Sequence, residues 1–153
     1  MPTWTPIYLI TWLDLLVRFL AGTGALIAVL IAVVNYRAQT RLKQAEWLKS
    51  LFEKFFENST YKEVRIWLDY GYLHDRLTVG EISLREVNEE KFTDFLNFFE
   101  FIGVLYSRKH LTIEQVSDVF DYYLGKIKSD ADCQQWINQY SFEKLKLLLE
   151  QYR

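Results

Sequence analysis

Residues 15–34 read LLVRFLAGTGALIAVLIAVV, an apolar run in which Arg18 is the only charge. Twenty residues of helix, at about 1.5 Å of rise per residue, span roughly 30 Å, the thickness of the hydrocarbon core of a bilayer. The run is too long for the apolar part of a secretory signal, no basic segment precedes it, and no small-residue cleavage motif follows it. The sequence therefore predicts an uncleaved, single-pass membrane anchor at residues 1–36.

Basic residues predict the orientation of this anchor. They gather after the apolar run, whereas residues 1–14 contain no Lys or Arg. By the positive-inside rule, the N-terminus is expected outside and residues 37–153 in the cytoplasm, as in a protein of the bacterial inner membrane. The basic side chains nearest to the run are candidate contacts for anionic lipid headgroups: Arg37, Arg41 and Lys43. Topology alone explains the same residues, so lipid specificity does not follow from them.

The alanines of the run fall on one stripe of the expected helix, spaced four, three and four residues apart: Ala21, Ala25, Ala28 and Ala32. The same rhythm reaches Asp14 and Arg18 on one side and Asn35 on the other. Small residues let membrane helices approach closely, and asparagine can form a hydrogen bond across such a seam. This pattern predicts a homo-oligomer that associates through the membrane helix. The alternative is a chance arrangement, because alanine is common in membrane helices.

Residues 37–153 are expected to form one cytosolic, all-α domain, a bundle of about five to six helices. Half of the chain is hydrophobic, 17% is aromatic, and both prolines precede residue 7. Apolar residues recur with the helical period. The membrane helix is expected to continue without a break through 37–57. The further expected helices are 60–73, 89–109, 113–128, 131–139 and a last one from 142, with a long loop at 74–87. The expected N-terminal caps are Thr60 with Glu63, Asn88, Thr112 with Gln115, and Ser141.

Three segments of the chain resemble a family of bacterial membrane-anchored proteins catalogued only as a domain of unknown function. They are NSTY at 58–61, LNFFEFIGV at 96–104 and LTIEQVSDVF at 111–120. The resemblance implies one N-terminal membrane helix followed by a basic continuation and a helical domain in the cytosol. It implies no chemistry, because no activity is established for that family.

Glu100 is the most distinctive polar residue of the cytosolic part, since Phe98, Phe99 and Phe101 surround it in the sequence. A carboxylate buried among phenylalanines needs a partner. Together with Asn97, one helical turn earlier, it could form a polar notch that contacts a ligand or a protein partner. The simpler expectation is a structural ion pair with Arg65 or another cation.

A basic turn at Arg108, Lys109 and His110 lies between the two best-defined helices. It could receive the phosphate of a small nucleotide-like ligand, although a solvated turn is the commoner explanation, because charged turns need no ligand to be stable. With a formal net charge of −2 and a pI near 5.7, duplex nucleic acid is not an expected partner.

The sequence contains no catalytic or nucleotide-binding motif, and its two histidines and one cysteine have no metal-ligand spacing. We therefore expect no enzyme activity, no cofactor and no metal. The sequence favours a membrane-tethered signalling or effector protein, of the kind used in prokaryotic stress or antiviral defence. In this hypothesis the cytosolic domain is coupled to a self-associating membrane helix. The alternative is a simple membrane anchor that carries a protein-binding adaptor domain.

Overall fold

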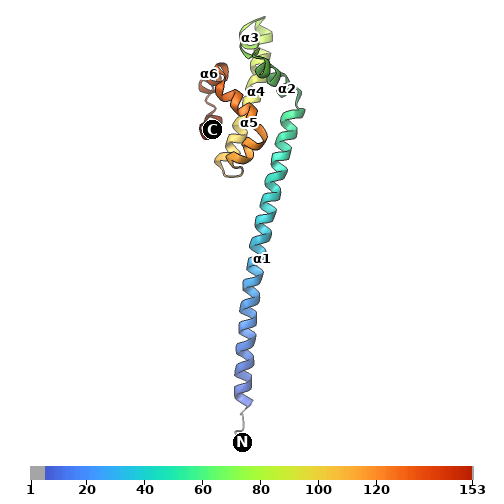
Figure 1. Ribbon diagram of the computed structural model, residues 1–153, viewed down its shortest axis with the longest axis vertical. Helices are drawn as coiled ribbons and strands as arrows, with labels where there is room; N and C mark the ends of the chain where they lie inside the picture. The colour runs from blue at the N-terminus through green and yellow to red at the C-terminus, as the bar shows by residue number, and fades with distance from the viewer. Residues whose placement is uncertain (1–5, 153) are drawn as a thin grey trace. The chain divides into compact units, whose positions relative to one another are not determined.

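The computed structural model describes residues 6–152, except for the side chains of residues 6–11, 13 and 25, and these residues form helices joined by short turns (Figure 1). The helices are α1 (Pro6–Glu57), α2 (Ser59–Tyr70), α3 (Leu73–Thr78), α4 (Ile82–Ser107), α5 (Ile113–Ser129), α6 (Ala131–Gln139) and α7 (Glu143–Gln151). The predicted all-α class is confirmed, and six described helices follow α1. The chain divides into two compact units, Met1–Lys43 and Gln44–Arg153.

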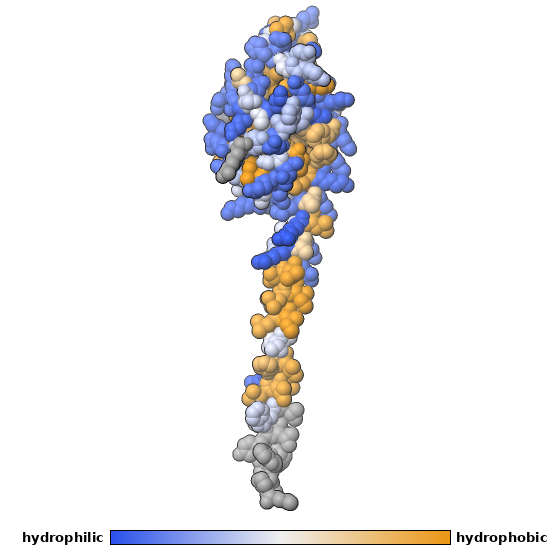
Figure 2. All heavy atoms as spheres, viewed as in Figure 1, coloured by the Kyte–Doolittle hydropathy of each residue, from blue (hydrophilic) through white to orange (hydrophobic). Residues whose placement is uncertain are grey.

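The described part of the first unit is the N-terminal portion of α1. Its large apolar side chains are exposed, as Leu26 is at 67%, and no residue of the most apolar 18-residue stretch of α1 is buried. Figure 2 shows these apolar side chains along the helix. Within the described residues, α1 is the one helix long and apolar enough to cross a membrane.

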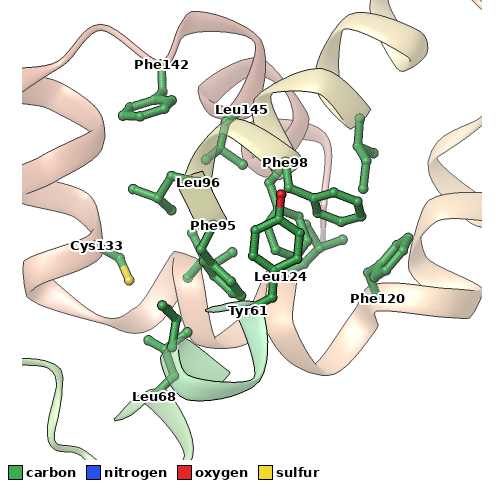
Figure 3. Close-up of a cluster of buried hydrophobic side chains, with 14 of the residues drawn as sticks. Tyr61, Leu68, Phe95, Leu96, Phe98, Phe120, Leu124, Cys133, Phe142 and Leu145 are labelled. Carbon is green, nitrogen blue, oxygen red and sulfur yellow. The ribbon is translucent and has the colours of Figure 1, made fainter. Parts of the chain in front are cut away.

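The second unit is built around α4, which packs against α2, α3 and α7. Its buried positions follow the helical period from Phe92 to Gly103, so that α4 presents apolar residues to several neighbours at once. Helix α5 packs against α6 and α7 and completes the domain. Figure 3 shows buried side chains from these helices converging in one core: Tyr61, Leu68, Phe95, Leu96, Phe98, Phe120, Leu124, Cys133, Phe142 and Leu145.

The last part of α1 belongs to this core through Leu51 and Phe55. Phe55 has no exposed surface. Its ring centroid lies 5.2 Å from that of Phe98, 5.3 Å from that of Phe120 and 5.1 Å from that of Tyr123. Such aromatic pairs contribute about 0.5–1.5 kcal/mol each beyond the burial of their surface. Phe55 is therefore a central contact between the last turns of α1 and the rest of the second unit.

Of the four predicted helix caps, those at Thr60, Asn88 and Ser141 are wrong, and the one at Thr112 is confirmed. Asn58, rather than Thr60, caps α2, because its side chain accepts a hydrogen bond from the Tyr61 backbone N–H at 3.2 Å. Ser141 does not cap α7 either, since it has a φ of 58° and the helix starts after Phe142. The capping box of Thr112 and Gln115 is present with both of its hydrogen bonds.

The predicted loop at 74–87 is also wrong. Its first residues form α3, and α4 begins at Ile82, so that Asn88 lies inside α4 instead of capping it. Asn88 is buried, and its side-chain amide donates a hydrogen bond to the backbone carbonyl of Arg76 at 2.9 Å. This bond ties α4 to the short helix before it.

Helices α4 and α7 approach each other at Gly103. A Cβ atom added to this glycine would lie 2.5 Å from the carbonyl carbon of Lys144 and 3.0 Å from the backbone nitrogen of Leu145. Both atoms belong to the backbone of α7 and cannot move aside as a side chain could. The absence of a side chain at residue 103 therefore sets the distance between the two helices.

Candidate functional site

The structure places the predicted membrane seam on α1. Ala21, Ala28, Ala32 and Asn35 are exposed, whereas the side chain of Ala25 lies outside the described residues. Arg18 and Asp14 form the expected pair within one helix, with 3.0 Å between Arg18 Nε and Asp14 Oδ2. Because each of these charges has the other as its partner, a second chain is not needed to neutralise them.

The predicted headgroup contacts Arg37, Arg41 and Lys43 are exposed on α1. Among the described residues no carboxylate lies within ion-pair distance of these three side chains. Their charges are therefore free to interact with a lipid surface or with solvent.

The predicted pair of Arg65 and Glu100 does not form. Arg65 is buried in α2, and its guanidinium donates hydrogen bonds to the backbone carbonyls of Phe55 and Phe56, the second at 3.2 Å. Its guanidinium carbon also lies 4.9 Å from the ring centroid of Phe55 and 4.7 Å from that of Phe56. These carbonyls are in the last turn of α1, where the helix dipole favours a cation. Arg65 therefore caps the C-terminus of α1.

Glu100 caps a different helix. Its two carboxylate oxygens accept hydrogen bonds from the backbone N–H groups of Lys144, at 3.1 Å, and Leu145, at 2.7 Å. These N–H groups belong to the first turn of α7, whose own cap residue Phe142 provides no side-chain hydrogen bond. Asn97 is exposed, and no described cavity includes Asn97 or Glu100. Glu100 thus has a structural partner in the first turn of α7, and a ligand contact by Asn97 and Glu100 stays a prediction.

The turn between α4 and α5 carries the remaining predicted residues, Arg108, Lys109 and His110, which are all exposed. The backbone carbonyl of His110 accepts a hydrogen bond from Gln44 Nε2 at 3.0 Å. The His110 ring packs edge-on against Trp47, with 5.4 Å between the ring centroids. Gln44 and Trp47 are in the part of α1 that belongs to the second unit, so α1 holds this turn in place.

An open surface cavity of about 570 Å³ lies beside this turn. We call it the α4–α5 cavity. It is lined by Tyr106, Ser107, Lys109, Leu111, Thr112, Ile113, Glu114 and Leu147. Most of its lining is apolar, with one cation and one carboxylate. Hydrogen bonds from the backbone N–H of Glu114 itself and from the Thr112 hydroxyl lower the pKa of the Glu114 carboxyl.

A second candidate surface was not predicted from the sequence. Six apolar side chains from the end of α2 to the first turns of α4 are exposed to between 46% and 69%: Tyr70, Tyr72, Val79, Ile82, Leu84 and Val87. We call this the α3 surface. It includes an open cavity of about 270 Å³ between α3 and α4. The rings of Tyr70 and Tyr72 stack on it with 6.0 Å between their centroids.

Histidine, cysteine and acidic side chains are the remaining groups of the described residues that could take part in chemistry. The described residues contain no group of three or more His, Cys, Asp or Glu side chains that could hold a metal ion. Cys133 is buried in the core, and burial, with Asp130 nearby, raises the pKa of its thiol well above its usual value, so the reactive thiolate does not form at neutral pH. His74 is exposed and pairs with Asp132, with 3.0 Å between Nδ1 and the carboxylate oxygen.

Comparisons with known proteins add no assignment: the chain matches no family model, and searches of curated proteins and of solved structures found no significant match. The resemblance to a bacterial membrane-anchored family stays a prediction. The functional interpretation rests on the α1 span, the α4–α5 cavity and the α3 surface.

Proposed function

We propose that the protein is a membrane-tethered, non-enzymatic signalling or effector protein, with a cytosolic helical domain coupled to a self-associating membrane helix. One observation carries this proposal. The exposed apolar span of α1 and the core residue Phe55 belong to the same helix, which the described residues continue without a break from Pro6 to Glu57.

Lipid is the environment that fits this span. Soluble monomeric proteins rarely expose a contiguous apolar patch larger than a few hundred Å². Along residues 15–34, by contrast, leucine, isoleucine, valine and phenylalanine side chains are exposed at one position after another. Alpha helices satisfy their own backbone groups, so such a span can enter the hydrocarbon region without loss of hydrogen bonds. The basic residues after the span favour a cytoplasmic position for the second unit, which is the orientation we propose at a bacterial inner membrane.

Coupling follows from the continuity of α1. A helix without a break transmits rotation or tilt, whereas a flexible linker does not. A cytosolic protein or a small nucleotide-like ligand that binds the second unit would thereby change the packing of neighbouring membrane helices. Arg65 and Phe55 are the contacts through which such a change would reach α1.

Two measurements test the anchor and its self-association. Alkaline carbonate should leave the protein in the membrane fraction, and its release into the supernatant would contradict the anchor. Replacing Ala28 and Ala32 with leucine should weaken crosslinking between membrane helices by filling the stripe. The matched control replaces Val29 and Val33 with leucine, which adds bulk at the same spacing on another side of the helix. Equal crosslinking in both variants would contradict self-association through the stripe.

A second candidate function is an adaptor, in which α1 only localises a protein-binding domain. The α3 surface favours it, because contiguous exposed apolar residues often mark a protein interface. Replacing residues 7–36 with an unrelated single-pass helix separates the two functions. Retained cellular activity favours the adaptor, and lost activity at normal expression favours the coupled effector.

A further inference from the structure

The turn between α4 and α5 contacts the first residues of the second unit, Gln44 and Trp47. In the sequence, these residues of the second unit are the ones that follow the apolar run most closely. Gln44, which donates to the His110 carbonyl, is ten residues after Val34, the last residue of the run. Ten residues of helix rise about 15 Å. The headgroup region of a bilayer takes up roughly 5–7 Å of that distance. Chain length alone therefore keeps this turn within reach of a membrane that holds the apolar run.

The chemistry of the turn fits an anionic lipid surface. Arg108 and Lys109 are exposed, and no carboxylate among the described residues pairs with either one. Cations near an anionic leaflet are attracted within about a Debye length, roughly 8–10 Å at physiological salt. The arginine and lysine side chains are long enough to cover most of the remaining gap.

The α4–α5 cavity adds an apolar component to this turn. Lys109 lines it together with Ile113 and the partly exposed Leu147. A lipid has both parts of this chemistry, since its phosphate suits the cations and its glycerol and acyl region suits the apolar lining.

A free phosphate is a poorer occupant. The N-terminus of α5 would be the natural anion site beside this turn, but its capping box already occupies the Thr112 hydroxyl and the Gln115 side chain. Glu114 also places a carboxylate in the first turn of α5, where it competes with an incoming anion. The remaining cations lie on the turn itself, next to the apolar cavity.

We propose that the α4–α5 cavity, with Lys109 in its lining and Arg108 beside it in the chain, is a docking surface for the anionic lipids of the membrane that holds α1. The proposal rests on the proposed membrane anchor and deepens it, because it names the lipids that the second unit would contact.

The test uses the full chain in lipid nanodiscs, with a fluorophore on a single accessible cysteine. Ser107→Cys places the label in the lining of the cavity, and Ser83→Cys places it near the opposite end of the same helix, about 36 Å away. Cys133 is buried and stays unlabelled. The nanodiscs contain phosphatidylcholine alone or with phosphatidylglycerol, and a small fraction of lipid carries a spin label on its headgroup as the quencher.

The expected result is strong quenching at residue 107 in anionic nanodiscs, weak quenching there in neutral ones, and little at residue 83 in either. Arg108→Gln with Lys109→Asn should reduce the quenching at least about two-fold, since each cation contributes to attraction by the leaflet. Asparagine is chosen because Lys109 has a φ of 59°, which asparagine tolerates. The control Lys54→Gln with Lys62→Gln removes two exposed charges elsewhere and should leave quenching unchanged.

Three outcomes overturn the docking proposal. They are equal quenching in neutral and anionic nanodiscs, equal quenching at residues 83 and 107, and no effect of the Arg108 and Lys109 substitutions. Loss of quenching on adding inorganic phosphate, but not chloride of equal ionic strength, would assign the turn to a free anion instead. Carbonate extraction distinguishes a failure of the membrane anchor from a failure of lipid docking. Release from the membrane refutes both proposals, and retention without quenching at residue 107 refutes docking alone.

Discussion

The guanidinium of Arg65 makes two contacts with Phe55. It donates a hydrogen bond to the Phe55 backbone carbonyl, and its central carbon lies 4.9 Å from the centroid of the Phe55 ring. The hydrogen bond satisfies a backbone carbonyl at the end of α1. The cation–π contact packs the guanidinium against a ring that belongs to the aromatic core. A single buried cation thus joins the end of the long helix to the domain that follows it.

Replacing Arg65 with methionine should destabilise the second unit by about 2–4 kcal/mol, because two carbonyls at the end of α1 lose a charged donor. Arg65→Lys should fall between this variant and the native chain, since one ammonium cannot reproduce two hydrogen bonds and a planar stack. Denaturant unfolding in detergent, followed by near-ultraviolet circular dichroism, measures the difference. Lys62→Met, at an exposed position of the same helix, is the control, and an equal loss in both variants would refute the capping role.

Gly103→Ala should destabilise the domain by about 1–3 kcal/mol, because the new methyl group meets the backbone of Lys144 and pushes α7 away from α4. Gly125→Ala is a matched control in another helix interior. Its Cβ would lie 3.4 Å from Tyr152 Oη, an ordinary contact, so this variant should be neutral or gain up to about 1 kcal/mol from helix propensity. Thermal unfolding of the two variants should give shifts of opposite sign, and a common sign would contradict the close approach at Gly103.

Glu100→Ala should destabilise the domain by about 1–2 kcal/mol, because the backbone N–H groups of Lys144 and Leu145 lose their acceptors. Glu100→Gln keeps one oxygen and should lose less. Hydrogen exchange at these two amides provides a local readout, which should accelerate more than exchange in α5. The control Glu90→Ala, at an exposed position of α4, should change neither quantity. Unchanged exchange at residues 144 and 145 in Glu100→Ala would show that the carboxylate does not cap α7.

Sequence patterns were sufficient where the information is local. The reciprocal bonds of Thr112 and Gln115 involve residues three apart, and the bounds of α6 follow from its apolar spacing, so both could be predicted. The membrane-length run is likewise a property of consecutive residues. The all-α class followed because helical spacing recurs throughout the chain.

Tertiary partners account for what could not be predicted. Leu73 and Leu77 are buried only because α3 packs against α4, and the polar residues around them gave the segment the pattern of a loop. Asparagine is common at helix starts, so the sequence alone predicted a cap at Asn88. In the structure Asn88 lies inside α4, and its side chain donates a hydrogen bond to the Arg76 backbone carbonyl. Glu100 was recognised as a carboxylate in need of a partner, but its partner is backbone 44 and 45 residues away, which no local pattern specifies.

His74 and Asp132 provide the last prediction, a dependence on pH. The hydrogen bond that the His74 ring donates to the Asp132 carboxylate, together with the charge of that carboxylate, raises the pKa of His74 above its usual 6.5. Because the folded pKa lies above the unfolded one, the pair contributes stability that is fully present below about pH 6.5 and is lost as pH rises through the folded pKa. Nuclear magnetic resonance titration of the His74 ring should therefore give a midpoint above 6.5. Asp132→Asn should move that midpoint down, and Asp118→Asn, on α5, should not; an unchanged midpoint in Asp132→Asn would refute the pairing.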